Sequence, residues 1–174
     1  MNRLHYLIDM TLFRPKEILN TYTDLNIKDL KDRCFKAVLL DIDNTIAVPN
    51  TGKCDDKAKQ FISDLQNNGF EVVIFSNNNE ERVRHFLDDL DVKYVHYALK
   101  PLPFSYIKTC KELNIKPSET IVLGDQLMTD ILGANLSGCY GIYTKRLQEK
   151  DSFLTSINRK MENFIWRHIL HEEV

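Results

Sequence analysis

Short apolar runs alternate along the chain with segments in which apolar residues recur at helical spacing. Each run is too apolar to leave one face in water. Runs of this kind between helical segments are typical of strands buried in a parallel sheet. We therefore expect an α/β fold, doubly wound, with a mostly parallel five-stranded sheet and helices on both faces. The expected strands cover residues 35–41, 70–75, 92–98, 120–123 and 140–143.

Four apolar stripes between these runs predict helices. The members of each stripe fall three or four residues apart and so share one face of a helix. We expect each stripe to pack against the sheet. The stripes are Ala58, Phe61, Ile62 and Leu65; Val83, Phe86, Leu87 and Leu90; Phe104, Ile107, Cys110 and Leu113; and Met128, Ile131, Leu132 and Leu136.

The two ends of the chain flank this α/β core, which we place at residues 35–147. Residues 1–34 are expected to form an N-terminal helical extension, and residues 148–174 a C-terminal amphipathic helix that carries Trp166. Between residues 145 and 170 there are six Lys or Arg side chains against three acidic ones. Such a helix can pack on its own domain, lie on an anionic membrane or contact another subunit, and all three readings stay open.

Composition limits the class of protein. The 174 residues, 43% of them hydrophobic, have the size of one domain, and a formal charge of −2 makes a nucleic-acid partner unexpected. The apolar runs are far shorter than the roughly 18 residues that cross a bilayer, and no secretory signal opens the chain. Four separated cysteines without a CxxC pair fit a cytoplasmic protein. Peripheral contact at the inner face of the membrane, through the C-terminal helix, is the alternative.

Polar side chains follow the first two expected strands, and ligands of parallel sheets bind outside the carboxyl ends of the strands. Asp41, Asp43 and Thr45 follow the first strand, whereas Ser76 and Asn77 follow the second. A carboxylate can attack phosphorus to form an aspartyl-phosphate, and a neighbouring carboxyl group can move the proton. A hydroxyl and the amides before a helix can bind phosphate.

The third and fourth strands end in the same manner. Lys100 follows the third strand and could neutralise the charge of a transferring phosphoryl group. Asp125 follows the fourth strand directly after Gly124, and Asp130 comes five residues later. Several acids at one place repel one another unless a cation lies among them, and Mg²⁺ prefers carboxylates, water and phosphate oxygens.

Each loop by itself also has a structural explanation. Asp, Asn and Thr favour turns, Asn79 can cap a helix, most lysines are solvated, and acids suit the first turn of a helix. Their joint occurrence at one edge of one sheet favours a functional site. We expect the carboxyl groups of Asp41, Asp43, Asp125 and Asp130 to converge around one divalent ion.

The combination resembles the haloacid-dehalogenase-like (HAD) phosphatases. Residues 41–45 (Asp-Ile-Asp-Asn-Thr) match the DxDxT motif, Ser76 the second motif, Lys100 the third and residues 124–130 the GDxxxxD acidic pair. The four motifs occur in family order over about residues 35–145. Asp-Asn-Thr, Ser-Asn-Asn, Lys-Pro-Leu-Pro and Gly-Asp-Gln-x-x-Thr-Asp are similar to subclass IIIA, which includes the bacterial and mitochondrial phosphatidylglycerophosphate phosphatases.

The resemblance implies a role for each residue at the first two strand ends. Asp41 would be the nucleophile, and Asp43 the general acid and base. Thr45 would support the loop and the bound phosphate. Ser76 and the backbone amide of Asn77 would hold the phosphoryl oxygens.

The resemblance also implies a cation site. Mg²⁺ would be held by the carboxylates of Asp41 and Asp125 and by the backbone carbonyl of Asp43. Asp130 would bind the ion directly or through water. Lys100 would stabilise the charge of the phosphoryl group as a catalytic and phosphate-binding residue.

Motif spacing bears on the substrate. Only 34 residues separate Asp41 from Ser76, and 23 separate Ser76 from Lys100, which leaves no room for a cap domain. An uncapped site suits a phosphate carried on something large, such as a lipid, a nucleic-acid end or a protein. The expected function is Mg²⁺-dependent phosphomonoester hydrolysis through an aspartyl-phosphate, with phosphatidylglycerophosphate the substrate by resemblance. The alternatives are a soluble phosphate ester, a polynucleotide end, or a receiver-like phospho-acceptor domain of signalling.

Overall fold

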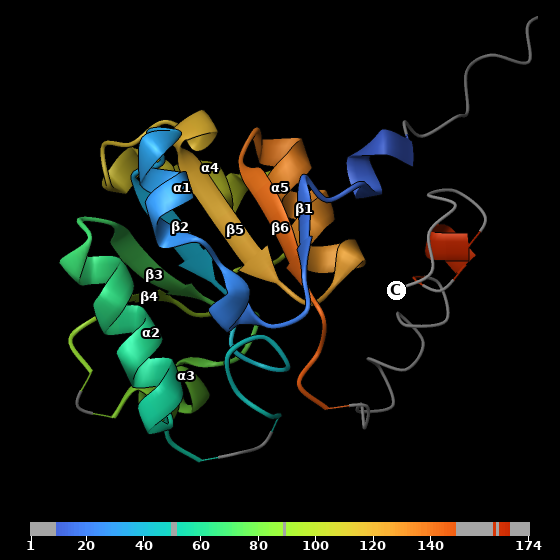
Figure 1. Ribbon diagram of the computed structural model, residues 1–174. Helices are drawn as coiled ribbons and strands as arrows, with labels where there is room; N and C mark the ends of the chain where they lie inside the picture. The colour runs from blue at the N-terminus through green and yellow to red at the C-terminus, as the bar shows by residue number, and fades with distance from the viewer. Residues whose placement is uncertain (1–9, 50–51, 89, 149–161, 163, 168–174) are drawn as a thin grey trace, which may run out of the picture.

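Six parallel strands form one open sheet in the computed structural model, which describes residues 10–49, 52–88, 90–148, 162 and 164–167 (Figure 1). The strand order across the sheet is β1-β6-β5-β2-β3-β4. The strands are β1 (Glu17–Leu19), β2 (Ala37–Leu40), β3 (Glu71–Phe75), β4 (Lys93–Val95), β5 (Thr120–Gly124) and β6 (Tyr140–Thr144). The helices are α1 (Ile27–Asp32), α2 (Asp56–Asn67), α3 (Glu80–Leu87), α4 (Pro103–Glu112) and α5 (Leu132–Ser137), with short helical turns η1 (Met10–Phe13), η2 (Tyr22–Asp24), η3 (Pro117–Glu119) and η4 (Leu127–Ile131).

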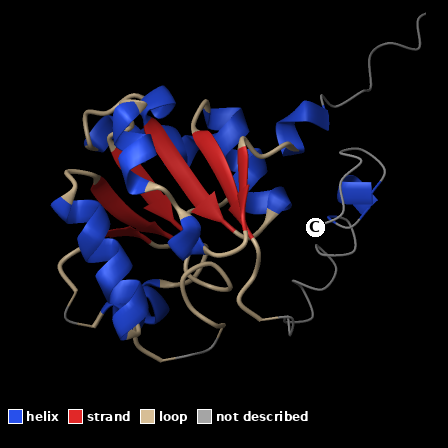
Figure 2. Ribbon diagram, viewed as in Figure 1, coloured by secondary structure: helices blue, strands red, loops and turns tan. Residues whose placement is uncertain are grey.

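Helices cover both faces of the sheet (Figure 2). Side chains alternate between the faces along a strand, so Val38 and Leu40 of β2 contribute to one hydrophobic cluster and Leu39 to another. The first cluster includes residues of α1, α2 and α3, and the second includes residues of α4 and α5. The expected doubly wound parallel architecture is confirmed.

The number of strands is six rather than the expected five. The additional strand, β1, comes from the segment that we expected to be helical, and its Ile18 pairs with Tyr143 of β6. Three residues, of which Ile18 is exposed, are too few to show an alternating pattern in sequence. The strand exists because β6 offers it a free edge, which only the assembled sheet provides.

Two of the expected helical stripes have the predicted buried faces. Ala58, Phe61, Ile62 and Leu65 are the buried residues of α2, and Val83, Phe86 and Leu87 those of α3. An apolar stripe three to four residues apart thus marks the sheet-facing side of both helices.

Half of the stripe expected in α4 is wrong: Cys110 is buried and Leu113 packs against the same cluster, but the other two members face solvent. Phe104 and Ile107 are exposed, and the helix instead buries Tyr106, Thr109 and Cys110. Tyr106 packs against Phe75 of β3, with ring centroids 4.6 Å apart. The face of α4 is therefore set by this aromatic contact with the sheet rather than by the most apolar spacing.

The fourth stripe is interrupted by a π-helical turn. η4 is a π-helix, in which the amide of Leu132 donates to the carbonyl of Leu127, and α5 follows it directly. Asp130 and Ile131, which lie within this turn, are buried, whereas Leu136 of α5 is exposed. Single π turns are frequent at functional sites.

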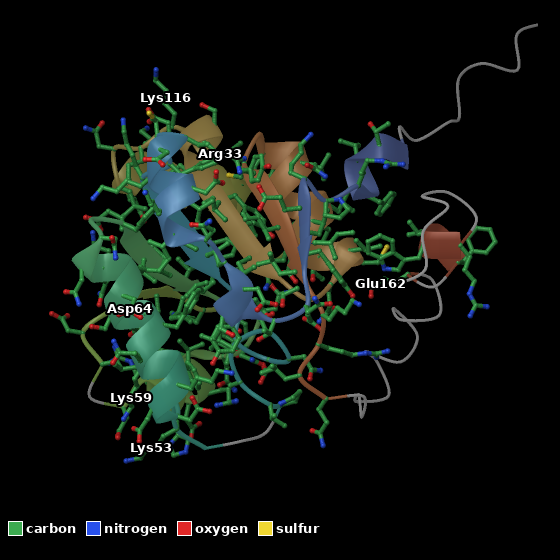
Figure 3. The ribbon with its side chains drawn as sticks, in the orientation of Figure 1. Arg33, Lys53, Lys59, Asp64, Lys116 and Glu162 are labelled. Carbon is green, nitrogen blue, oxygen red and sulfur yellow. The ribbon has the colours of Figure 1, made fainter. Side chains whose placement is uncertain are left out.

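The described part of the C-terminal segment packs on the core. Ile165 and Trp166 are buried in a cluster with Phe13 and residues of η4 and β6, and Trp166 meets Tyr143 edge to face, with ring centroids 5.3 Å apart. Glu162 accepts a hydrogen bond of 3.1 Å from the amide of Met128 (Figure 3). Of the three open readings, packing holds at these residues, because Tyr143 and η4 offer Trp166 an apolar surface. Residues 149–161, 163 and 168–174, and residues 1–9, lie outside the described range.

Over the described residues, no helix has both the length and the hydrophobicity needed to cross a bilayer. The four cysteines are free thiols, three of them buried.

Candidate active site

Asp41 lies at the carboxyl end of the buried central strand β2. Its backbone amide donates to the carbonyl of Leu123 on β5 at 3.0 Å, which continues the strand pairing by one residue and fixes the position of Asp41. The Thr45 hydroxyl donates to Asp41 Oδ2 at 3.1 Å. The side chain of Asp41 is thereby held at the edge of the sheet where a ligand is expected.

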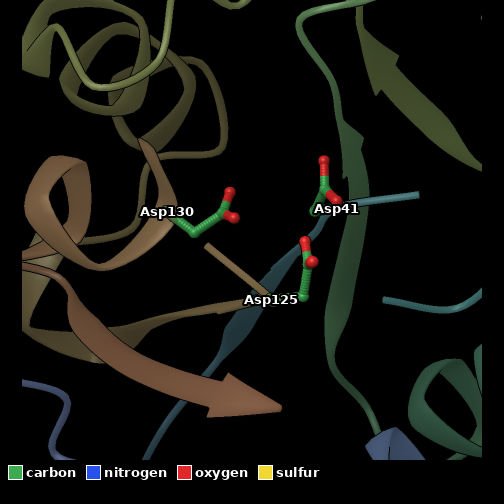
Figure 4. Close-up of side chains that lie close together, drawn as sticks. All are labelled: Asp41, Asp125 and Asp130. Atoms are coloured by element: carbon green, nitrogen blue, oxygen red, sulfur yellow. The ribbon is translucent and has the colours of Figure 1, made fainter. Parts of the chain in front are cut away.

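Asp125 and Asp130 meet Asp41 from the neighbouring strand (Figure 4). One carboxylate oxygen from each of the three residues lies within 4.8 Å of the others, and all three residues are buried. Asp125 follows β5 directly, and the π turn η4 brings Asp130 back over the strand end, where the Gln126 amide donates to its Oδ2 at 3.2 Å. The predicted meeting of these three carboxyl groups is confirmed by the geometry.

Gly124 makes this arrangement possible. A Cβ atom at position 124 would lie 2.2 Å from Cγ of Asp130, well inside any van der Waals contact. The absence of a side chain at the last residue of β5 therefore provides the space that the Asp130 carboxyl group occupies.

Lys100 joins the acidic residues. Its Nζ donates to Asp41 Oδ1 at 2.6 Å and to Asp130 Oδ1 at 2.7 Å, and its side chain is buried. The Asn77 side chain holds the backbone of Lys100 in place, because Oδ1 accepts from the Lys100 amide at 2.8 Å and Nδ2 donates to its carbonyl at 3.2 Å. Asn77 thus ties the second loop to the third.

Carboxylates outnumber ammonium groups in this cluster. Three buried carboxylates face one ammonium group, which leaves two negative charges when all four groups are ionised. Burial raises the pKa of Asp41 to about 6, although Lys100 opposes the shift. For Lys100, burial acts to lower the pKa, but Asp130 and Asp41 outweigh it and the pKa is raised. An all-oxygen donor set of three buried carboxylates fits a hard divalent cation.

The carboxyl group of Asp43 lies apart from this cluster. Asn78 Nδ2 donates to its Oδ2 at 2.5 Å, and Arg82 Nη2 donates to its Oδ1 at 3.1 Å. The expected convergence of four carboxyl groups is wrong for this side chain. The chain leaves the extended conformation directly after Asp43, since the amides of residues 45–47 all turn back to the carbonyl of Ile42.

Arg82 is a site residue that sequence reasoning missed. It also donates from Nη1 to the carbonyl of Gly52 at 3.3 Å and so links Asp43 to the loop that follows it. Nothing in the spacing of α3 distinguishes Arg82 from the exposed Arg84. Only the packing of α3 beside the first loop brings the guanidinium group to Asp43.

Ser76 is buried at the end of β3, and its hydroxyl oxygen accepts from the Asn78 amide at 3.1 Å. Asn79 caps α3, with Oδ1 accepting from the Arg82 amide at 2.9 Å, so the structural explanation given for Asn79 is correct. Hydrogen bonds connect the predicted site residues into one chain of contacts, from Thr45 to Asp41, from Asp41 to Lys100 and from Lys100 to Asp130. Asn77 joins this chain through its bond to Lys100.

A protein-family model described as "Mitochondrial PGP phosphatase" matches residues 1–147. The chain belongs to this family. The membership confirms the resemblance to the HAD phosphatases that the four motifs indicated. The protein is therefore an enzyme, a phosphoric monoester hydrolase. The alternative of a receiver-like signalling domain is excluded by this membership.

Two curated relatives match nearly the whole chain. The "Probable phosphatase YqeG" of Bacillus subtilis is 30% identical over 153 residues, covering 88% of this chain and 89% of the relative. The mitochondrial phosphatidylglycerophosphatase GEP4 of Saccharomyces cerevisiae is 28% identical over 180 residues, covering 95% and 96%.

Solved structures share the fold of this chain. An uncharacterized protein from Listeria monocytogenes superimposes with a TM-score of 0.55 at 18% identity, covering 74% of this chain and 98% of that one. The cobalt-bound deoxy-D-mannose-octulosonate 8-phosphate phosphatase from Haemophilus influenzae has a TM-score of 0.55 at 13% identity, covering 79% and 90%. At these identities the likeness extends to the fold alone.

Proposed function

We propose that this enzyme hydrolyses the phosphomonoester of phosphatidylglycerophosphate to give phosphatidylglycerol, with Mg²⁺ as its cofactor and an aspartyl-phosphate on Asp41 as the intermediate. The observation that carries the proposal is the buried cluster of Asp41, Asp125 and Asp130 around Lys100, in a chain that belongs to the PGP phosphatase family. The name of the yeast relative supports the lipid as substrate.

In the first step, a carboxylate oxygen of Asp41 attacks phosphorus and the bond from phosphorus to the glycerol oxygen breaks. Asp43 donates a proton to the departing oxygen, so that the lipid leaves as an alcohol. Thr45 and Lys100 hold the Asp41 carboxylate in one orientation, at 3.1 Å and 2.6 Å, which lowers the entropic cost of the attack.

In the second step, the Asp43 carboxylate takes a proton from water, and the water oxygen attacks phosphorus. The bond from phosphorus to Asp41 breaks, inorganic phosphate leaves, and the carboxylate is regenerated. Ser76 and the Asn77 amide are proposed to hold the phosphoryl oxygens, and Lys100 to neutralise their charge together with the cation.

The carboxylates of Asp41, Asp125 and Asp130 are the groups that would hold Mg²⁺, with the carbonyl of Asp43 the ligand implied by the family motif. When bound, the ion supplies positive charge to the phosphoryl oxygens and reduces the repulsion among the three carboxylates. The cytoplasmic location expected from the cysteines stays a prediction.

The test is turnover by the full chain on phosphatidylglycerophosphate and on a panel of water-soluble phosphate esters, before and after chelation and Mg²⁺ addition. Asp41→Asn is expected to lose turnover on every substrate while its circular dichroism stays unchanged. Asp32→Asn, an exposed acid at the end of α1, is the matched control. In the wild type, an acid-quenched reaction is expected to show a phosphate adduct on the peptide that contains Asp41.

The outcomes separate the parts of the proposal. Retained turnover in Asp41→Asn removes this residue as the nucleophile. Turnover that resists chelation removes the metal. A marked preference for a water-soluble ester over the lipid removes phosphatidylglycerophosphate as the substrate and favours the alternative that an uncapped site also permits.

A further inference from the structure

Exposed apolar side chains are concentrated in one short segment of the chain. Of the nine large apolar side chains that the described residues expose, five fall within residues 97–107, and we call these five the 97–107 patch. The other four, Ile18, Leu136, Leu147 and Phe164, are separated along the chain. Such concentrations on a protein surface mark places of interaction. The patch consists of Tyr97, Leu99, Leu102, Phe104 and Ile107, which are 59%, 59%, 56%, 72% and 48% exposed.

The backbone of the patch turns two of these side chains outward at an energetic cost. Tyr97 and Leu99 have φ angles of +45° and +56°, a left-handed conformation that bulky residues rarely adopt. Ala98 between them is fully buried, and its amide donates to the carbonyl of Ser76 at 2.9 Å. Small polar residues would suit these two exposed positions better, so their apolar character indicates a role outside the fold.

The patch continues onto the exposed face of α4. Phe104, Ile107, Lys108 and Lys111 are three or four residues apart and exposed, whereas Tyr106 on the other side is buried. Apolar side chains therefore occupy the first turns of this face, and lysines follow them. Glu112 lies 3.8 Å from Lys108 in an exposed pair, a separation at which the attraction is weak in water.

The patch also borders the active site. Leu99 and Leu102 flank the segment of Lys100, whose Nζ contacts Asp41 and Asp130. The amide of Leu102 donates to the carbonyl of Leu99 at 2.9 Å, which closes a turn around the lysine. The segment that carries Lys100 into the carboxylate cluster is therefore also the segment that exposes Leu99 and Leu102.

We propose that the 97–107 patch is a membrane-docking surface, whose apolar side chains enter the interface of an anionic phospholipid bilayer while Lys108 and Lys111 contact the head groups. The inference rests on the proposed function, because a lipid phosphate must reach a buried site from the surface of a bilayer. A surface with aromatic and aliphatic side chains beside lysines has the chemistry of an interfacial contact.

The position of the patch favours a bilayer over a protein. Lysines beside exposed apolar side chains match the anionic head groups and the apolar interior of a bilayer, whereas a folded partner or a second copy has no such fixed arrangement. A bilayer that contacts the segment of Lys100 also carries the proposed substrate. The inference moves the expected membrane contact from the C-terminal helix, whose Ile165 and Trp166 are buried, to the loop after β4 and the start of α4.

The experiment compares two variants of the full chain in vesicle flotation. Phe104→Gln with Ile107→Gln alters the patch, and Phe164→Gln replaces another exposed phenylalanine, in the C-terminal segment. With vesicles of phosphatidylcholine and phosphatidylglycerol, the patch variant is expected to bind at least tenfold more weakly than the wild type, on the order expected from losing two buried apolar side chains. Phe164→Gln is expected to bind as the wild type does. Vesicles of phosphatidylcholine alone are expected to bind the wild type more weakly, because they lack the anionic charge.

Turnover separates this inference from the proposed function. The ratio of turnover on vesicle-borne phosphatidylglycerophosphate to turnover on a water-soluble ester is expected to fall about tenfold in the patch variant. If the patch variant binds vesicles as the wild type does and has the same turnover ratio, the docking surface is overturned and the hydrolase proposal stays intact. A change in oligomeric state by light scattering, with unchanged vesicle binding, overturns it in favour of a protein contact. Absence of metal-dependent turnover on any phosphomonoester by the wild type overturns the proposed function itself.

Discussion

Substitution of Gly124 by alanine is expected to disable the site with a single methyl group. The added Cβ would lie 2.2 Å from Cγ, 2.4 Å from Oδ2 and 2.5 Å from Cβ of Asp130. Non-bonded carbon atoms are stable at about 3.5 to 4.0 Å, so the Asp130 carboxyl group has to move by more than about 1 Å. A displacement of this size breaks its 2.7 Å contact with Lys100.

The expected magnitudes follow from this displacement. Overpacking a buried position costs about 1 to 3 kcal/mol, and the disturbed contact between two buried charges adds to that cost. For a chain of this length we expect the melting temperature to fall by about 4 to 8 °C, which corresponds to about 2 kcal/mol. Misplacement of a catalytic group by about 1 Å lowers turnover by roughly 100-fold. The variant is therefore expected to stay folded at the assay temperature while its turnover is strongly reduced.

The assay pairs thermal unfolding, with and without Mg²⁺, with turnover on a water-soluble phosphomonoester. Gly52→Ala is the matched control, because its Cβ would meet only His85 Nε2, at 3.6 Å, an ordinary contact. In Gly124→Ala we also expect Mg²⁺ to raise the melting temperature less than in the wild type, since the carboxylate cluster is disturbed. If Gly124→Ala melts with the wild type and turns over within twofold of it, the packing argument at Asp130 is wrong.

Two further predictions concern Arg82 and the cysteines. Arg82→Met is expected to lower kcat by roughly 10- to 100-fold, since it removes a charged hydrogen bond to Asp43, whereas Arg82→Lys recovers part of the rate; an unchanged kcat in Arg82→Met would show that Asp43 needs no such support. The native protein is alkylated at mildly alkaline pH and analysed by mass spectrometry, and Cys34 is expected to be modified before Cys54. Cys34 is exposed, whereas Cys54 is buried, and its burial together with the charge of Asp55 raises its pKa to about 11. Since only the thiolate reacts, Cys54 is expected to gain reactivity as the pH approaches its pKa, and equal rates at both positions near pH 8 would contradict this reading.

The chemistry of the site was largely determined by local sequence. Asp41, Ser76, Lys100 and Asp125 each come at or after the end of an apolar run, and parallel strands bring their carboxyl ends to one edge whatever the rest of the chain does. The buried faces of α2 and α3 were likewise predictable, because an apolar stripe at helical spacing has only one way to face the sheet.

Tertiary structure decided the features that depend on a partner distant in sequence. β1 is a strand because β6 offers it an edge, and the side chain of Asp43 is held at the rim because α3 packs Arg82 beside it. The face that α4 buries follows from the contact of Tyr106 with the sheet, which turns Phe104 toward solvent. Spacing along a chain records which residues share a face, but the energy that selects the buried face comes from the surface it meets.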